Sequence, residues 1–358
     1  MILTIITWIA VLTFAIQLGF WIFIFSKIGF LSPIQPILTH FKGVSVVICV
    51  KNEAENISRL IQLILDQNYP EFELIIIDDH SQDQTWEIIS NYANKDPKIR
   101  VFKNPKAGKK PGIIYGVSQA LHSWLLFTDG DCTPSSKLWI QSMTEHTSES
   151  KIIVLGYAPY FKTTGWLNKL IRFECVFNTI QSFSSVLIGI PYMGVGRNLM
   201  YHKSISDPLK MRLELAFGDD DLLVNRQATS ENTTFATHVN SFVYTHAKKT
   251  WSSYFNQKRR HFSSSLYYNL RSKILISCFF MSLFVFYFTL TILFINGYYG
   301  LTFSLYFIKI IISWTLYSKC CKKWNEKDLI PLYPILELQY VMFLLIQIPF
   351  LFIPKKTW

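Results

Sequence analysis

The chain has 358 residues, of which 50% are hydrophobic and 16% aromatic, and its mean hydropathy is +0.23. These values are too high for a purely soluble protein and indicate membrane segments beside one sizeable domain. The net charge of +11 fits either nucleic acid or an anionic lipid surface, and the position of the basic residues argues against nucleic acid. They crowd beside apolar runs, with Lys248, Lys249, Lys258, Arg259, Arg260, Arg271 and Lys273 before one and Lys319, Lys322 and Lys323 after another. Six cysteines without a CxxC spacing argue against a zinc site and a disulfide framework.

The first apolar run covers residues 2–25, carries no charge and is long enough to cross a bilayer as a helix. The alternative is a cleaved signal peptide, but the run lacks a basic start and a small-x-small cleavage site before Lys27. We therefore predict an anchor over residues 1–26 and a linker over residues 27–42. Basic residues follow the run, and this bias places the bulk of the chain on the cytoplasmic side.

The region 43–249 has a different pattern, in which apolar strands alternate with amphipathic helices. Strands separated by helices of this length predict a parallel sheet with helices on both faces, an α/β fold. Ligands of such sheets bind beyond the carboxyl ends of the strands. The predicted strands are 44–50, 72–77, 99–102 and 125–127, and the predicted helices are one capped by Asn52 with its apolar face over 57–65, one at 84–94 and one at 112–122.

Polar side chains follow three of these strands, and their strand ends meet at one edge of the sheet. They are Asn52 and Glu53, Asp78 and Asp79, and Asp129 and Asp131. The stretch 125–131, LLFTDGD, is the most informative, because two carboxylates one residue apart offer the hard oxygen ligands that suit Mg²⁺ or Mn²⁺. Such an ion usually bridges a diphosphate. The alternative is a solvated acidic turn after each strand, with Ser81, Asp83 and Thr85 only capping the next helix.

Six segments in a fixed order make the chain resemble a family 2 inverting nucleotide-sugar glycosyltransferase. The segments are VSVVICVKNEAENI, FELIIIDDHSQDQT, AGKKPG, LLFTDGDCTP, FGDDDLLVNR and QKRRH, and they span residues 43–262. The resemblance implies the GT-A fold, with a Rossmann-like, mostly parallel sheet. It is specific for the family and only weakly specific for the substrate, with a family preference for UDP.

The resemblance also implies roles for individual residues. Asn52, Glu53, Asp78 and Asp79 would hold uridine and ribose, and Lys109 would lie near the nucleotide. Asp129 and Asp131 would form the D-x-D motif, with Asp131 preferred as the direct metal ligand. From the sequence alone, Lys109 lies in a Gly-Lys-Lys-Pro loop that could place an amine near a diphosphate or form a solvated basic turn.

A second acidic centre lies at residues 218–221, GDDD. Adjacent carboxylates repel one another, so at least one should have a raised pKa, as a general base near neutral pH requires. In the family pattern G-D-D-x-x-L the base falls on Asp220, and Asp219 is a credible substitute. The alternative is an acidic first turn of a helix.

These groups predict a single in-line displacement. Asp220 takes the proton of the acceptor hydroxyl, its oxygen attacks the anomeric carbon, and cations neutralise the departing diphosphate. Two carboxylates could instead hydrolyse a glycosidic bond. A hydrolase, however, does not need nucleotide-site acids ahead of the D-x-D.

The segment between the acidic centres is predicted to face the acceptor. Apolar residues at helical spacing over 166–180 indicate a core helix, although the flanking Lys169 and Arg172 leave open an interfacial helix that admits a lipid. The following PYMGVGRNLMY segment contains a tight Gly turn, and by resemblance Gly196, Arg197 and Asn198 lie on the acceptor side.

Residues 250–273 form a basic amphipathic segment, predicted as an interfacial helix. By resemblance its QKRRH carries the Q-x-x-R-W motif, with Gln257 and Arg260 in register at the nucleotide sugar and His261 on the acceptor side in place of tryptophan. In polymerising members that tryptophan helps to form the acceptor entrance. The departure therefore puts processive synthesis in doubt, but not sugar transfer.

The region 274–358 is again rich in apolar residues, as membrane segments are. Residues 274–295 and 301–317 predict a hairpin of two spans, and residues 331–353 predict either a third span or a half-embedded segment. A third span would place Lys355 and Lys356 outside, against the usual bias. We therefore leave the C-terminal region at two or three helices.

The sequence thus predicts an integral membrane enzyme, of a bacterial inner membrane, with a cytoplasmic catalytic domain. It would use a nucleotide sugar, a divalent metal and a lipid or lipid-linked glycan acceptor, with no nucleic acid. The alternatives are a processive polysaccharide synthase and a catalytically silent sugar-nucleotide-binding assembly subunit. The identity of the sugar and acceptor and the oligomeric state are not predicted.

Overall fold

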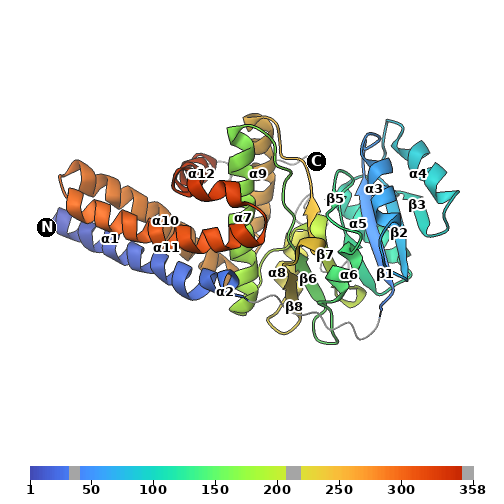
Figure 1. Ribbon diagram of the computed structural model, residues 1–358, viewed down its shortest axis with the longest axis horizontal. Helices are drawn as coiled ribbons and strands as arrows, with labels where there is room; N and C mark the ends of the chain where they lie inside the picture. Colours follow the sequence, from blue (N-terminus) through green and yellow to red (C-terminus); the bar gives the residue numbers. More distant parts are fainter. Residues whose placement is uncertain (32–40, 207–218, 349–358) are drawn as a thin grey trace.

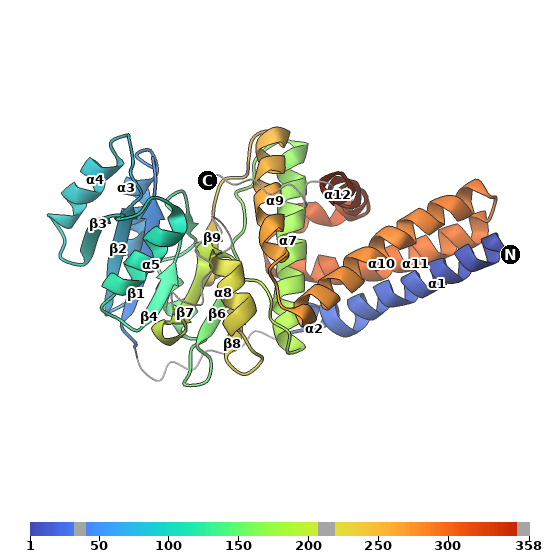
Figure 2. The same ribbon diagram turned by 180° about the vertical axis from the view of Figure 1, so that it is seen from behind.

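The computed structural model describes residues 1–31, 41–206 and 219–348. An α/β domain lies at one end of an elongated molecule, and a bundle of long helices lies at the other (Figure 1). Helices that run across the bundle axis separate the two parts, as the view from behind also shows (Figure 2).

The α/β domain is built on a seven-stranded sheet of order β3-β2-β1-β4-β7-β6-β8. The first four of these strands are mutually parallel, and only β7 runs against its neighbours. The predicted α/β architecture with a mostly parallel sheet is therefore confirmed. The strands are β1 (Val44–Val50), β2 (Phe72–Asp78), β3 (Ile99–Lys103), β4 (Trp124–Phe127), β6 (Ile153–Gly156), β7 (Leu199–His202) and β8 (Thr233–Ala236), and β5 (Thr133–Pro134) pairs with β9 (Val243–Tyr244) in a second sheet.

Helices cover both faces of the sheet because the central strands are apolar on both sides. In β1, Val46 and Ile48 face one core, whereas Val47 and Cys49 face the other. Helix α5 lies close against the second face: a Cβ added at Gly116 would come within 2.7 Å of Val47. The helices of this domain are α3 (Ile57–Leu65), α4 (Thr85–Ala93), α5 (Lys109–Gln119), α6 (Trp139–Thr144), α7 (Trp166–Leu187) and α8 (Asp219–Gln227).

Two local predictions were wrong. Asn52 does not cap the first helix: it has a φ of 55°, and α3 begins after Asn56. The side-chain oxygen of Asn52 instead accepts a hydrogen bond from the backbone N–H of Gln82, which joins the ends of two neighbouring strands. Lys109 begins α5 rather than lying in a loop, so that this helix starts before the predicted residue 112.

Helix α7 is the core helix that the apolar spacing predicted, and the interfacial alternative is wrong for Arg172. Its guanidinium is 2% exposed and lies between two acids beyond α11. Nε lies 2.9 Å from Glu326, and Nη1 lies 2.9 Å from Asp328. Because Lys162 also pairs with Asp328 at 3.0 Å, this cluster joins the α/β domain to the C-terminal helices.

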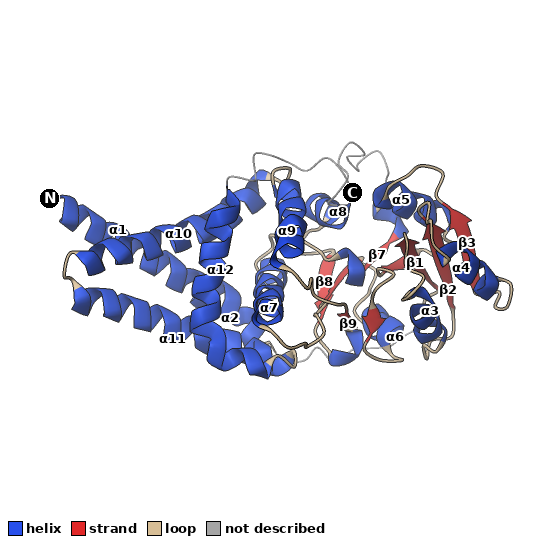
Figure 3. Ribbon diagram, turned by 90° about the horizontal axis from the view of Figure 1, so that it is seen from above, coloured by secondary structure: helices blue, strands red, loops and turns tan. Residues whose placement is uncertain are grey.

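Four helices among the described residues are long and apolar enough to cross a membrane. Helices α1, α10 and α11 run side by side, whereas α12 crosses them (Figure 3). The predicted linker residues 32–40 and the last part of the predicted segment 331–353 lie outside the described residues. The helices are α1 (Ile2–Gly19), which continues through a π-helical turn (Phe20–Phe25) into α2 (Ser26–Gly29), then α9 (Trp251–Ser265), α10 (Leu270–Ile295), α11 (Tyr299–Lys323) and α12 (Tyr333–Gln347).

Candidate active site

The acids that follow β2 are buried at the carboxyl edge of the sheet. Asp79 Oδ1 accepts hydrogen bonds from Asn104 Nδ2 at 2.6 Å and from the backbone N–H of Gly108 at 2.8 Å. The other oxygen of Asp79 and Oδ1 of Asp78 are buried without a hydrogen-bond partner in the described part of the chain. Buried acceptors of this kind require donors. The sequence had not singled out Asn104.

Glu53 lies beside the D-x-D turn. A Cβ on Gly130 would meet Glu53 Cγ at 3.0 Å, so the central glycine lets the two turns approach closely. Burial raises the pKa of Glu53, and the charges of Asp131 and Asp129 raise it further, against the effect of a hydrogen bond from Asn56. Three acids thus share one small region.

The D-x-D follows β4 as predicted, and its two carboxylates have different partners. Asp129 Oδ1 lies 2.5 Å from Lys109 Nζ at the start of α5. Burial alone would raise the pKa of Asp129, but the Lys109 ammonium outweighs it and holds the pKa below its usual value. Asp131 Oδ2 accepts a hydrogen bond from Thr245 at 3.1 Å, just beyond β9. Both carboxylates are therefore oriented by neighbours from other parts of the chain.

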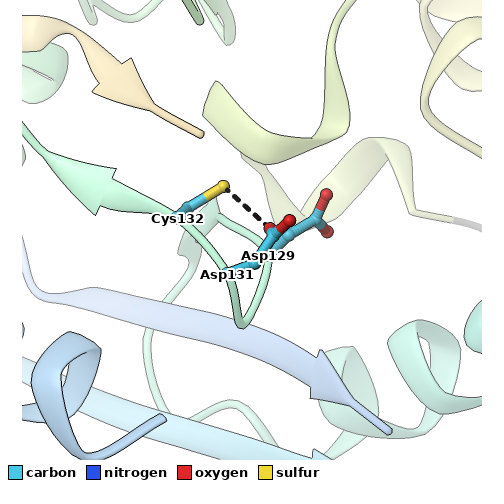
Figure 4. Close-up of side chains that lie close together, drawn as sticks. All are labelled: Asp129, Asp131 and Cys132. Atoms are coloured by element: carbon cyan, nitrogen blue, oxygen red, sulfur yellow. Dashed lines mark hydrogen bonds between the residues drawn. The ribbon is translucent and has the colours of Figure 1, made fainter. Parts of the chain in front are cut away.

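The D-x-D turn fits a divalent cation. Ligand atoms of Asp129, Asp131 and Cys132 lie within 4.8 Å of one another (Figure 4). Burial and the two carboxylates raise the pKa of the Cys132 thiol, which stays protonated and points at Asp131. Because a protonated thiol is a poor ligand and carboxylate oxygens are hard donors, the set favours Mg²⁺ or Mn²⁺ over zinc.

Asp220 lies at the start of α8 and is held by the Gly turn before β7. Its Oδ2 accepts a hydrogen bond from the backbone N–H of Gly196 at 2.5 Å. A Cβ at Gly196 would come within 2.8 Å of the same oxygen, so only glycine allows this approach. The structure thus brings Gly196 and the favoured base together. Gly218 and the side chain of Asp219 lie outside the described part, and the raised pKa predicted within GDDD stays a prediction.

The two residues after Gly196 have different positions. Arg197 stacks on Tyr160, 4.7 Å from the ring centroid, and its positive charge helps to lower the pKa of Asp129. Asn198 is buried, and its amide accepts from Trp139 Nε1 and donates to the carbonyls of Tyr157 and Ser241. Its predicted place on the acceptor side is therefore wrong, because its side chain stabilises the core.

A cavity of about 290 Å³ lies among some of these groups. Its lining includes Lys109, Asp129, Arg197, Asp220 and, from α9, Gln257. A hollow therefore connects the D-x-D with the second acidic centre. Residues that share a polar face of α7 complete it: Cys175, Asn178, Thr179 and Ser182.

Helix α9 carries the QKRRH segment and packs against α7. Gln257 reaches the cavity, whereas the side chains of Arg260 and His261 lie outside the described part. Lys258 also lines the cavity, and its Nζ lies 2.7 Å from Glu174, which is 2% exposed. Sequence reasoning missed Lys258 as a cavity residue, and it missed the face of α7 that carries positions 175, 178, 179 and 182, although these recur at helical spacing.

Residues 45–207 match the family model described as Glycosyl transferase family 2. The matched part covers less than half of the chain, and it is similar to that family. The chain is 31% identical over 125 residues to a cholesterol galactosyltransferase of Borreliella burgdorferi, over 35% of each chain. It is also 31% identical over 90 residues to a poly-beta-1,6-N-acetyl-D-glucosamine synthase of Staphylococcus epidermidis, over 25% of this chain and 22% of the relative. The matched part thus spans about a third or less of these relatives' length.

A mannosyltransferase of Pyrobaculum calidifontis, solved in complex with GDP-Man and Mn²⁺, has a similar fold. Its TM-score is 0.61 at 14% identity, and the match covers 90% of this chain and 98% of that one. The domain therefore has the GT-A fold, as the ordered segments predicted.

Proposed function

We propose that the protein is a membrane-anchored inverting glycosyltransferase. It moves a hexose from a nucleotide sugar, UDP-linked by family preference, to a lipid or lipid-linked glycan acceptor, with the catalytic domain on the cytoplasmic face of a bacterial inner membrane. The observation that carries the proposal is the cavity that joins Lys109 and Asp129 to Asp220 and to the wall formed by α7 and α9.

The donor half is supported by the unpaired buried oxygens of Asp78 and Asp79, which can accept from the N–H of a base and the hydroxyls of a ribose. Asn52 and Glu53 border the same edge. Lys109 and Arg197 bring positive charge to where the diphosphate would lie. Asp131 and Asp129 would hold Mg²⁺ or Mn²⁺, which when bound offsets the negative charge of the departing diphosphate.

The transfer step is assigned to Asp220, with Asp219 as the substitute. The Gly196 N–H fixes one oxygen of Asp220, and the carboxylate lies at the cavity wall, within reach of an acceptor hydroxyl there. The carboxylate takes the proton as the acceptor oxygen bonds to the anomeric carbon, and the bond from that carbon to the diphosphate oxygen breaks. Attack from the opposite face inverts the anomeric configuration. Gln257 and Arg260 are proposed to contact the donor, and His261 the acceptor side.

Membrane attachment is supported by α1, α10 and α11, which run together away from the catalytic domain (Figure 1). A lipid acceptor follows from that location. A processive synthase is the second possibility, supported by the similarity to a polysaccharide synthase. His261 in place of the motif tryptophan favours single transfer.

The test compares UDP release in detergent with Mn²⁺ and extracted lipid for the wild type and Asp220→Asn. We expect the rate to fall by about 10³-fold, because general-base catalysis contributes roughly 10²–10⁴-fold. Asp66→Asn is the matched control, since Asp66 pairs with Lys137 on the surface. Equal rates for wild type and D220N would remove the base assignment.

Two further readouts separate the alternatives. UDP binding without any release by the wild type would indicate the silent subunit. Products longer than one sugar would indicate the synthase.

A further inference from the structure

Helix α12 and the 3-10 helix before it (Lys327–Leu332) are together long and apolar enough to count as a membrane span, but the direction of α12 does not fit one. The candidate span that contains it covers residues 327–347 with a mean hydropathy of 1.8. Figure 3 shows α1, α10 and α11 running along the long axis, while α12 lies across them next to α7 and α9. In Figure 1 the same helix is seen nearly end-on, at the catalytic-domain end of the bundle.

The inner face of α12 packs on the helices that line the catalytic cavity. Phe343 stacks on Tyr254 of α9 with ring centroids 4.8 Å apart. Tyr340 lies against Phe173 and Phe177 of α7, at 5.9 Å and 5.7 Å. The position of α12 is therefore coupled to the walls of the active site.

Polar contacts within apolar surroundings fix this crossing. Glu337 of α12 is buried and pairs with Lys309 of α11. The hydroxyls of Tyr287 and Tyr333 donate to the same carboxylate, each at 2.9 Å. Breaking a buried pair of this kind is strongly destabilising, because it leaves a charge buried without its partner. The contacts therefore oppose a rotation of α12 into line with α11.

The outer face of α12 is apolar and exposed. Its residues recur at helical spacing and are Ile335, Leu338, Met342, Leu345 and Ile346, with exposures from 41% to 59%. Exposed Lys322 and Lys327 flank the connection from α11, where they suit anionic lipid headgroups. An apolar face beside basic groups is the pattern of a helix that lies in a membrane interface. The apolar face also adjoins the exposed apolar sides of the bundle, which supports a bilayer as its covering.

We propose that α12 lies in the plane of the bilayer, at the boundary between headgroups and hydrocarbon, and does not cross it. The proposal rests on the membrane attachment in the proposed function but not on the transfer chemistry. Of the two alternatives predicted for residues 331–353, it favours the half-embedded segment and not a third C-terminal span. It also places the α7 and α9 walls of the cavity at the level of the lipid headgroups, where a lipid acceptor carries its hydroxyl.

Spin labels on α12 test the proposal in the full-length protein reconstituted in lipid nanodiscs. Ile335→Cys and Ile346→Cys are suitable because both positions are 59% exposed and lie near opposite ends of the helix. Cys278 is exposed and is first replaced by serine, and this parent without an added cysteine measures the background. Accessibility to oxygen and to a nickel chelate gives the depth of each label.

In-plane placement predicts that the two labels lie at the same shallow depth, within about 5 Å. A spanning helix would separate them by about 16 Å, given a rise of about 1.5 Å per residue. Ile274→Cys and Ile295→Cys near the ends of α10, 59% and 74% exposed, serve as the control for a spanning helix. Their depths should show one label near each surface.

A depth difference near 16 Å between the α12 labels would overturn the proposal. Full accessibility of both labels to the nickel chelate would also overturn it, because α12 would then lie in water. UDP release by the labelled proteins is measured in parallel. Absence of UDP release in the wild type would contradict the proposed function and leave the depth result unchanged.

Discussion

The donor half and the acceptor half of the proposed active site are built in different ways. The donor half consists of short turns at the ends of adjacent strands, where Asp79 and Asp129 meet partners from the same sheet edge. The acceptor half consists of helices α7 and α9, which buried polar contacts such as Glu174 with Lys258 hold together. We infer that changes in the donor half act on metal and nucleotide, whereas changes in the acceptor half act through packing.

The largest effect is expected for Asp131→Asn. Loss of one carboxylate charge at the D-x-D should lower kcat by about 10³-fold, because electrostatic stabilisation of a leaving group is among the largest catalytic terms. The Mn²⁺ concentration needed for half-maximal rate should rise. Titration of UDP release with Mn²⁺ measures both, and an unchanged metal dependence would remove Asp131 from the metal site.

Gly196→Ala should have the next largest effect. The added Cβ would lie 2.8 Å from Asp220 Oδ2 and displace that carboxylate. Because small misplacement of a catalytic group can cost about 10²-fold, we expect kcat to fall by that order while the KM for the donor stays constant. Gly300→Ala is the control, since a Cβ there meets nothing within 4 Å. Wild-type kcat in G196A would show that Asp220 does not need its present position.

Glu174→Gln tests the acceptor half. It leaves Lys258 without its charged partner, so α9 should shift and the acceptor KM should rise by about 10-fold, or roughly 1.4 kcal/mol. The donor KM should not change. The double variant Glu174→Gln with Lys258→Met removes both charges and should recover thermal stability, but not acceptor affinity. A rise confined to the donor KM would contradict the division into two halves.

The smallest effect on activity is expected for Glu73→Gln, far from the strand ends that form the site. Burial would raise the pKa of Glu73, but hydrogen bonds from Ser45, Arg100 and Leu121 lower it overall. A lowered pKa in the folded state means that the carboxylate stabilises the fold above its ordinary value of 4.5, and this stabilisation is lost as the pH falls below that value.

Melting curves between pH 7 and pH 3 measure this contribution. The wild type should lose stability more steeply below pH 4.5 than E73Q, which should already be about 1 kcal/mol less stable at pH 7. UDP release at pH 7 should stay within about twofold. If the stability of the wild type and that of E73Q fell equally steeply with pH, Glu73 would not be the titrating group.

The sequence was most informative where reactive side chains directly follow a predicted strand. LLFTDGD predicted both the strand and the carboxylates after it, because a short apolar run is stable only when buried, whereas acids directly after it need solvent or a cation. It could not show that Asn198 faces the core, since an asparagine after a glycine turn has the same local pattern in either case. The place of Lys258 in the cavity could not be predicted either, because it depends on the ion pair with Glu174, which is distant in the chain. Contacts between remote helices leave no local pattern to find.

The cluster around Arg172 has a consequence for substrate choice. Its guanidinium joins α7 to the acids between α11 and α12. The proposed reaction centre therefore cannot move along the bundle axis independently of the long apolar helices. In the proposed membrane setting, the site would therefore work at a fixed distance from the lipid surface. Acceptors would then be sorted by how far their reactive hydroxyl projects, as well as by the chemistry around it.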